Sequence, residues 1–546
     1  MEASQQTNNK ASECLSSALA SLIGNGDVPV PVPVSVPDTV TENGAPAFSD
    51  TKDLCLNLFV SCVRDTPEEK IRSLLASAWA EDSQTTLAIL LHLRDCRNGK
   101  DGKGGKGEKA LTRFALLWLR ENHPCTYLIN LPEFINHGCF KDLCELTKLV
   151  YQKKYPILGK KTWVELEYLS EFVKEDSQKL SQTANQAKVP ITLVFKWLPT
   201  ENTHFDYKDN GNQAWVLAHL LYPELDGMKA MRVYRKELSK GRENLKIVEK
   251  LLSSKRYDEI DFASLPAKAH RLLRKAFQKH APEQYNAYLQ LLSEGKAKIN
   301  STGTQPHELV NVYLTQGGLD QTIEGQWRDV LKKLASAGTL GSAMAISDVS
   351  GSMSGQPMQV AIALGILLSE LIPEPFKGQL ITFSADPTLH QVTGNSLYDK
   401  VNSVKNMPWG MNTNLLAVFK LLLGFAKSHQ VSKENMPKTL FIFTDMQFDV
   451  AERNPWKTTY QTIQDLYAEG GYDVPFIVFW NLRDVKPSFP VTADTPGVAL
   501  VSGFSAELLR TFMSGDLLDM TPTKVMLQTL VPYLELVKVH PTDSKL

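Results

Sequence analysis

The pattern of hydrophobic and polar positions changes once along the chain, near residue 338. Between about residues 51 and 321, apolar stretches are separated by charged turns or by turns that contain glycine and proline. These stretches do not alternate as strands do, and stacked helical hairpins would bury their apolar sides. We therefore predict an all-helical repeat scaffold for this part of the chain.

After residue 338, short apolar or β-branched runs alternate with helical segments. The predicted strands cover residues 342–347, 379–383, 439–444, 476–480 and 498–502, with a short edge strand at 389–392. The predicted helices cover residues 358–371, 415–428, 458–469 and 506–513. Such alternation is typical of a doubly wound, mainly parallel, Rossmann-like sheet. The expected fold class is therefore α + α/β.

Three parts follow from these patterns. Residues 1–45 are mostly polar, and residues 28–34 alternate valine with proline, which removes backbone donors and favours an extended conformation. We predict a disordered tail over residues 1–45, a helical domain over 46–337 and a sheet domain over 338–546.

The composition excludes some classes of function. The 546 residues carry a formal net charge of -1, so a polyanion would have to bind to a local basic patch. The sequence shows no secretory signal and no apolar run of the ~20 residues that cross a bilayer, so we expect no membrane partner. The seven cysteines contain no C-x-x-C pair, which favours reduced thiols. We expect an intracellular protein, cytoplasmic or alternatively nuclear.

Oxygen-bearing side chains gather directly after the first predicted strand of the sheet. Asp348, Ser350 and Ser352 occupy alternate positions, so one carboxylate and two hydroxyls can point the same way. In a doubly wound sheet, the loops at the carboxyl ends of the strands converge on the ligand site. Hard oxygen donors with few charges suit Mg²⁺ or Mn²⁺, so we predict a site for one of these ions.

The D-x-S-x-S sequence that begins at Asp348 resembles the metal-ion-dependent adhesion site of von Willebrand factor A domains. Two further elements of that site are matched by Thr413, before a predicted helix, and Asp445, at the end of a predicted strand. The resemblance implies that Ser350, Ser352 and Thr413 are direct ligands, and that Asp348 and Asp445 bind directly or through water. It also implies an open position that accepts a carboxylate from an acidic residue of a protein partner. The alternative is a turn that binds no metal.

An enzymatic interpretation is weaker. Phosphatases of the haloacid dehalogenase type use D-x-D, in which the second aspartate protonates the leaving group, and Ser350 cannot do so. His390 and His429 are single histidines, and we interpret them as surface or core residues. We therefore predict a binding protein and not an enzyme.

The helical part carries a string of short motifs. They lie at residues 97–99, 104–109, 116–119, 123–124, 130–131, 137–143, 234–238, 257–262, 265–269, 295–300 and 306–310. In combination they resemble the uncharacterised TROVE-like family related to the Ro autoantigen, whose members have a C-terminal von Willebrand factor A domain. The resemblance implies an arc of TROVE/HEAT-like helical repeats that binds structured RNA. The glycine-rich segment 99–109 lacks the spacing of a phosphate loop, and we interpret it as a mobile basic loop.

Local charge supports RNA binding. Residues 229–279 contain 15 Lys/Arg and 6 Asp/Glu, and helical spacing places some of the basic residues in two stripes. The stripes are Arg232, Arg235, Lys236 and Lys240 on one helix, and Lys268, Arg271, Lys275 and Lys279 on another. Two aligned stripes could follow a phosphate backbone. The alternatives are a pair of solvated amphipathic helices, or a face that docks on an acidic patch elsewhere in the chain.

We therefore expect a non-enzymatic scaffold that holds structured RNA in a ribonucleoprotein and carries a divalent-metal site. The alternative is a metal-dependent protein–protein interaction scaffold without RNA, and a hydrolase is third.

Overall fold

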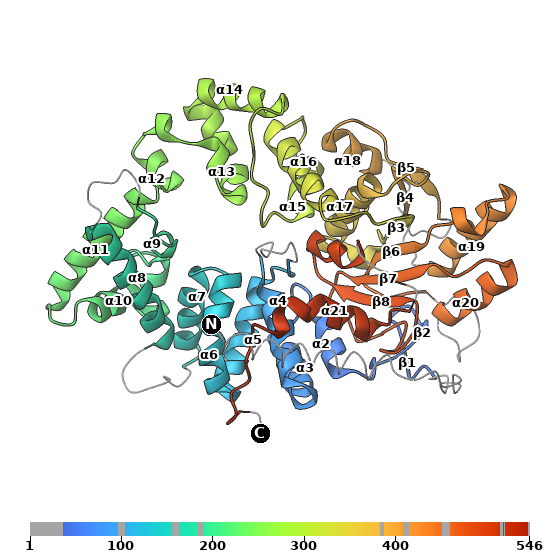
Figure 1. Cartoon of the computed structure of the whole chain (residues 1–546), viewed down its shortest axis with the longest axis horizontal. Coiled ribbons are helices and arrows are strands. Elements are labelled where there is room, and N and C mark those ends of the chain that lie inside the picture. The colour runs from blue at the N-terminus through green and yellow to red at the C-terminus, as the bar shows by residue number, and fades with distance from the viewer. Residues whose placement is uncertain are drawn as a thin grey trace, which may run out of the picture. The chain divides into compact units, whose positions relative to one another are not determined.

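In the described part of the chain, helices predominate between residues 54 and 335, and a six-stranded sheet follows (Figure 1). The computed structural model describes residues 36–96, 104–154, 163–182, 189–382, 387–405, 407, 414–449, 459–513, 517 and 519–543. Residues 37–546 form one compact unit, and the relationships below lie within it. Among the described residues, no helix is both long and apolar enough to cross a bilayer.

The helices before the sheet each bury an apolar face. They are α2 (Leu54–Ser61), α3 (Glu68–Glu81), α4 (Ser83–Arg94), α5 (Lys109–Asn122), α6 (Pro124–His137), α7 (Lys141–Gln152), α8 (Val164–Gln182), α9 (Val194–Trp197), α10 (Gln213–Leu221), α11 (Gly227–Asn244), α12 (Val248–Ser253), α13 (Ala267–His280), α14 (Pro282–Ser293), α15 (Pro306–Thr315) and α16 (Gln321–Ala335). Their boundaries follow from capping. Asp82, for example, ends α3 and begins α4, because its carboxylate accepts the amide protons of Gln84 and Thr85.

The sheet has the strand order β5-β4-β3-β6-β7-β8, in which only β5 is antiparallel to its neighbour. The strands are β3 (Ala343–Ser347), β4 (Gln379–Thr382), β5 (Leu389–Gln391), β6 (Thr439–Thr444), β7 (Phe476–Asn481) and β8 (Val498–Ser502). The helices of this part are α17 (Gln356–Leu371), α18 (Leu397–Lys405), α19 (Leu415–Ser428), α20 (Thr459–Gly470) and α21 (Pro522–Leu534). The predicted combination of a helix-rich chain with a C-terminal, mostly parallel sheet is confirmed. The helical repeat stays a prediction.

Burial explains why the strands appear in the sequence as continuous apolar runs. Every residue of β3, β6, β7 and β8 is buried, as expected for parallel strands that are covered on both faces. The apolar core continues from the sheet into the helices, since α2 packs on β8, α21 on α4, and α15 on α17. A second, smaller cluster of apolar side chains lies between α12, α13 and α14.

A hairpin of β1 (Thr39–Val40) and β2 (Pro46–Ala47) precedes α2 and packs beside the loop that follows β6. Thr41 Oγ1 donates to the Phe448 carbonyl at 2.7 Å, and the Glu42 amide donates to Gln447 Oε1 at 2.6 Å. The sequence predicts a disordered tail over residues 1–45, but residues 39–45 belong to this hairpin, which these hydrogen bonds hold in place. The valine–proline run at residues 28–34 lies outside the described residues.

The described end of the glycine-rich segment is packed, in contrast to the mobile loop predicted for it. A Cβ at Gly105 would overlap the His92 carbonyl, so only glycine allows this approach. Lys106 is buried, and its Nζ contacts the Phe59 carbonyl near the end of α2 and Ser502 Oγ at 2.6 Å. Burial lowers the pKa of Lys106 to about 8. The lysine thus links α2 to β8.

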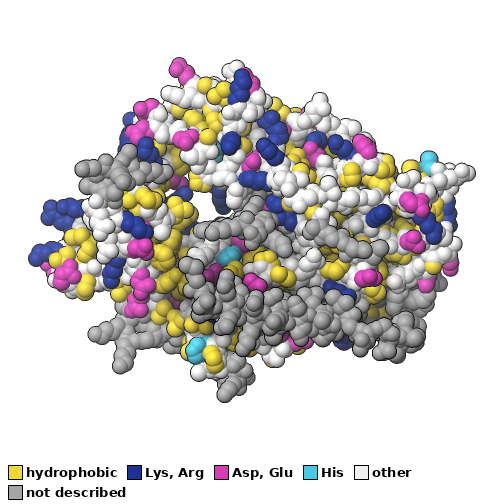
Figure 2. Space-filling model, viewed as in Figure 1, with side chains coloured by type: hydrophobic (Ala, Val, Ile, Leu, Met, Phe, Trp, Pro, Cys, Tyr) yellow, Lys and Arg dark blue, Asp and Glu magenta, His cyan; other side chains and the backbone are white. Residues whose placement is uncertain are grey.

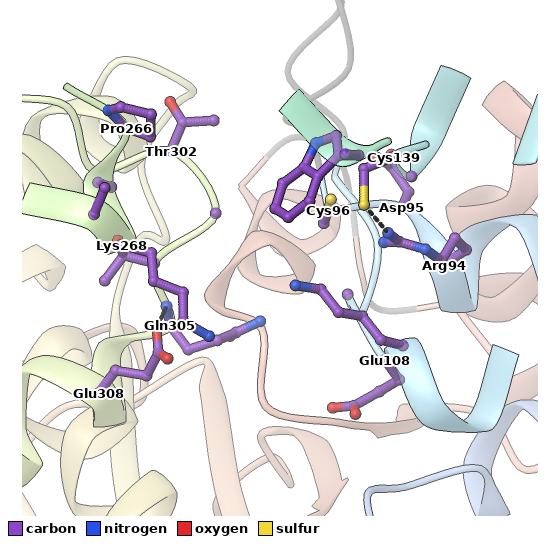
Figure 3. A pocket seen from close by; sticks show the side chains of 18 of the residues that line it. Arg94, Asp95, Cys96, Glu108, Cys139, Pro266, Lys268, Thr302, Gln305 and Glu308 are labelled. Atoms are coloured by element: carbon purple, nitrogen blue, oxygen red, sulfur yellow. Dashed lines mark hydrogen bonds between the residues drawn. The ribbon is translucent and has the colours of Figure 1, made fainter. Parts of the chain in front are cut away.

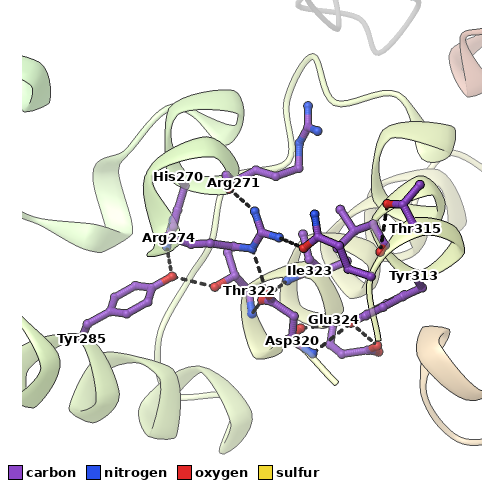
Figure 4. A network of polar contacts seen from close by, with 12 residues as sticks. His270, Arg271, Arg274, Tyr285, Tyr313, Thr315, Asp320, Thr322, Ile323 and Glu324 are labelled. Carbon is purple, nitrogen blue, oxygen red and sulfur yellow. Dashed lines mark hydrogen bonds and ion pairs between the residues drawn. The ribbon is translucent and has the colours of Figure 1, made fainter. Parts of the chain in front are cut away.

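A polar network joins α13, α14 and α16 (Figure 4). His270 Nε2 lies 3.2 Å from Tyr285 Oη, which lies 2.6 Å from Thr322 Oγ1. Beside it, Arg274 forms an ion pair of 2.6 Å with Asp320, the residue that caps α16. Burial lowers the pKa of His270 to about 4, so the imidazole is neutral at neutral pH.

Candidate functional site

Two buried carboxylates meet at the edge of the sheet formed by the carboxyl ends of its strands. Asp348 directly follows β3, and Asp445 directly follows the neighbouring parallel strand β6. The Asp348 amide donates to the Phe443 carbonyl at 2.9 Å, which continues the ladder to this edge. Both side chains are 0% exposed. These are the two aspartates predicted as metal ligands, and the fold places them on adjacent strand ends.

The Asp348 carboxylate accepts hydrogen bonds from Ser350 and Thr444. Its Oδ1 accepts from the Ser350 amide at 2.9 Å, and its Oδ2 accepts from Thr444 Oγ1 at 2.7 Å. Burial, and after it the nearby Asp445, raises the pKa of Asp348 to about 6. No lysine, arginine or histidine in the described part of the chain forms an ion pair with either aspartate. The negative charge is therefore held without a cationic side chain.

Asp445 has an unsatisfied oxygen. Its Oδ1 accepts from the Gln447 amide at 3.1 Å, whereas its Oδ2 is buried and has no hydrogen-bond partner among the residues that the structure describes. A buried carboxylate oxygen without a donor is costly, and a second buried carboxylate beside it adds to the cost. A divalent cation would compensate both charges. The oxygen of Asp445 that no described residue partners therefore indicates that these residues fit a metal ion.

Ser350 and Ser352 supply hydroxyl oxygens at the same place. Their Oγ atoms lie 3.0 Å apart in a short helical turn (Gly351–Met353), and Ser350 is buried. Carboxylate and hydroxyl oxygens are hard donors, as Mg²⁺ and Mn²⁺ require. The four residues Asp348, Ser350, Ser352 and Asp445 therefore fit such an ion. Thr413, the fifth predicted ligand, lies outside the described residues.

Another group of possible metal ligands, Asp53, Cys55 and Glu81, has a different explanation. Asp53 Oδ1 accepts the Leu56 amide at 2.7 Å, and Glu81 Oε2 accepts the Leu54 amide at 2.7 Å and the Cys55 amide at 3.0 Å. These carboxylates cap the first turn of α2. Burial also raises the pKa of the Cys55 thiol to about 12, which disfavours a thiolate ligand.

The predicted RNA-binding stripes lie on α11 and α13, where Figure 2 shows basic side chains at the surface. Seven of their eight members are exposed: Arg232, Arg235, Lys236, Lys240, Lys268, Lys275 and Lys279. Of these, Arg235 forms an ion pair with Glu201 at 2.6 Å. Arg271 is mostly buried and pairs with Glu308 at 2.8 Å. Arg271 is therefore not a free surface cation of this stripe, because α15 packs Glu308 against it.

A cavity of about 1670 Å³ lies between the segments around α5, α9, α13 and α15 (Figure 3). Arg235 and Lys268 are the members of the predicted stripes that line it. Lys109 and Lys196 also line it, and neither forms an ion pair with any residue that the structure describes. The sequence did not predict Lys109 and Lys196 as a pair, because they lie far apart along the chain and helical spacing relates only residues of one helix.

Comparisons with known proteins match families whose function is not described. The domain of unknown function DUF2828 matches residues 41–168 and 166–340, and the domain of unknown function DUF7788 matches residues 342–531. The chain is 35% identical over 514 residues to the uncharacterized protein L728 of Acanthamoeba polyphaga mimivirus. The matched region covers 90% of this chain and 87% of the viral protein.

These matches correct the family resemblance drawn from the sequence. The matching families are neither a TROVE module nor a von Willebrand factor A domain, so the assignment to a TROVE-like family with an A domain is wrong. The reason is that short motifs such as D-x-S-x-S, placed after a strand, are not specific to one family. The case for a metal site therefore rests on the geometry of the candidate ligands alone.

Proposed function

The chain belongs to the protein family defined by DUF2828, with a DUF7788 domain after it, and on this premise we propose a non-enzymatic, cation-dependent binding protein. A divalent ion, Mg²⁺ or Mn²⁺, would be held by Asp348, Ser350, Ser352 and Asp445. The partner is a protein that presents an acidic side chain to the ion. The buried Oδ2 of Asp445 carries the proposal, since no described residue gives it a hydrogen-bond donor or the positive charge that a cation would supply.

The surroundings of the serines support binding over catalysis. Ser350 Oγ lies 3.0 Å from Ser352 Oγ, and within the described part of the chain neither hydroxyl has a hydrogen bond to a histidine that could act as a base. His390 contacts Ser403 at 3.3 Å, and His429 contacts the Phe425 carbonyl at 3.0 Å. Both histidines therefore have partners outside this site.

The test is a thermal unfolding series with and without Mg²⁺ or Mn²⁺ on the full chain. At a metal concentration 100 times the dissociation constant, binding should add about 2.7 kcal/mol to the free energy of unfolding. The double variant Asp348→Ala/Ser350→Ala should lose this gain. Ser354→Ala is the matched control, because its Oγ donates to the Gly351 carbonyl in the same loop. Identical melting of the wild type with and without metal, or a preference for Zn²⁺, would refute the proposal.

A second candidate function is RNA binding, which Lys109 and Lys196 in the cavity and the exposed lysines of the stripes favour. Lys236, Lys240, Lys275 and Lys279 are exposed and form no ion pair within the described part of the chain. Phosphate contacts make RNA affinity fall steeply with salt, whereas a cation-bridged protein contact should vanish on chelation.

Charge reversal tests the RNA candidate. Lys275→Glu/Lys279→Glu should weaken binding of a structured RNA and reduce the salt slope by roughly two units, one for each lost contact. Lys420→Glu/Lys427→Glu on α19 is the matched control, since both lysines are exposed on a helix of the other part. No affinity at low salt, or equal affinity for both double variants and the wild type, would contradict RNA binding at this surface.

A further inference from the structure

Arg483 lies at the same sheet edge as the candidate cation site. β7 is the neighbour of β6, and Arg483 follows its last residue, Asn481, by two positions. The Arg483 amide donates to Asn481 Oδ1 at 3.2 Å, and Asn481 Nδ2 donates to the Val60 carbonyl at 3.1 Å. These bonds attach the loop to α2, so the backbone from which Arg483 projects is held in a defined position.

The guanidinium group reaches the loop that carries the hydroxyl ligands. Its Nη1 donates to the carbonyl oxygen of Ser352, the residue whose Oγ belongs to the candidate site. Arg483 is exposed and forms no ion pair with a carboxylate in the described residues. The adjacent Asp484 is occupied by Lys70, whose Nζ lies 2.6 Å from its Oδ1. Within the described residues, Arg483 therefore keeps an uncompensated positive charge and unused N–H donors beside the cation site.

Charge balance indicates what these donors are for. The two buried aspartates carry two negative charges, which one divalent ion would neutralise, so an added anionic group would leave an excess of one negative charge. Arg483 supplies the matching positive charge, and its planar fork of donors fits a carboxylate. Building on the proposed function, we infer that Arg483 is the second anchor of the partner's acidic side chain. One carboxylate oxygen faces the cation site, and the other accepts from the guanidinium.

Two other roles for Arg483 make different predictions. A tether that only holds the Ser352 loop would change the affinity for the metal itself. A phosphate anchor would hold phosphate in preference to a carboxylate. The experiment therefore has to measure the metal and the anion separately.

In the test, Mn²⁺ is both the bound ion and the spectroscopic probe, and the protein is the full chain. Electron paramagnetic resonance measures bound Mn²⁺, and the relaxation of acetate protons near bound Mn²⁺ measures the ternary complex. Inorganic phosphate, followed by its phosphorus relaxation, forms the parallel arm. Arg483→Ala should weaken acetate binding about tenfold, the size of a charge-assisted hydrogen bond, and leave Mn²⁺ affinity unchanged. Arg483→Lys should be intermediate, because it keeps the charge without the fork.

Lys486→Ala is the matched control, since Lys486 is another exposed cation three residues along the same loop. Acetate binding that is equal in Arg483→Ala and the wild type would overturn the inference while the cation site stands. So would a parallel loss of Mn²⁺ affinity, or an Arg483-dependent preference for phosphate. A wild type that binds no Mn²⁺ would refute the proposed function and the inference with it.

Discussion

Thr444 Oγ1 donates a hydrogen bond of 2.7 Å to Asp348 Oδ2 and so joins the ends of β6 and β3. The same hydroxyl accepts the amide proton of Met446 at 3.1 Å. Thr444 thus positions both the carboxylate of Asp348 and the backbone that follows Asp445.

Thr444→Val should destabilise the metal-free protein by about 1–3 kcal/mol, because a buried carboxylate oxygen loses its donor. Thr444→Ser should behave like the wild type, since it keeps the hydroxyl. Urea unfolding in chelator-treated buffer measures both. A valine variant as stable as the wild type would show that the hydrogen bond contributes nothing to stability.

Asp445→Asn should have opposite effects on the metal-free and metal-loaded protein. Without metal, it removes a buried charge next to Asp348, and stability should rise by about 1–2 kcal/mol. With Mg²⁺, the stabilisation seen in the wild type should disappear. The same substitution at the exposed Asp494 is the control and should do neither. Lower stability of the metal-free Asp445→Asn protein would contradict the electrostatic account of the site.

His270 should make the protein sensitive to acid. Its folded-state pKa is lowered to about 4 by burial, so between pH 4 and its ordinary value near 6.5 the unfolded state binds more protons. Stability is therefore fully present above about pH 6.5 and is lost as the pH falls toward 4, by about 3 kcal/mol in total. His270→Gln, which does not titrate, should flatten this part of the curve. Unfolding measured from pH 7 to pH 4 on both proteins decides the point, and parallel curves would exclude His270 as the cause.

Gln447 should control the N-terminal hairpin. Its Oε1 accepts from the Glu42 amide at 2.6 Å, and its Nε2 donates to Ser488 Oγ at 2.7 Å. Gln447→Ala removes both bonds, so amide hydrogen exchange over residues 39–47 should become at least several-fold faster. Ser488→Ala is the control, because it removes only the second bond. Unchanged exchange in Gln447→Ala would mean that the other contacts of the hairpin, such as Thr41 Oγ1 to the Phe448 carbonyl, are enough to hold it.

The sequence predicts the parts of the site that depend on strand order along the chain. Asp348 and Asp445 follow apolar runs that alternate with helices, and parallel strands bring their carboxyl ends to one edge. Arg483 and Thr444 carry no such signal. Their contacts depend on β7 lying beside β6 and β6 beside β3, and a single sequence does not contain that order.

The basic stripes show the opposite limitation. Helical spacing places Arg235 and Arg271 correctly on α11 and α13, but it says nothing about the acidic residues that other segments bring to them. Glu201 and Glu308 are 34 and 37 positions away, respectively. Spacing within one helix therefore predicts a side chain's face and not its partner. The prediction also lacks α18 and α21, although α21 buries Val525, Met526, Leu530 and Tyr533 at helical spacing.

The bonds that join α2 to β8, and α4 to α21, also determine when the protein can finish folding. Ser502 Oγ donates to the Phe59 carbonyl at 2.9 Å across a separation of 443 residues, and Gln84 Nε2 donates to the Leu534 carbonyl at 2.8 Å. At a synthesis rate of about 5–20 residues per second, the ribosome needs roughly 20–90 s to supply the later partner. During that interval the apolar face of α2 has no sheet to cover it. The nascent N-terminal helices are therefore a natural substrate for chaperones until the last strand emerges.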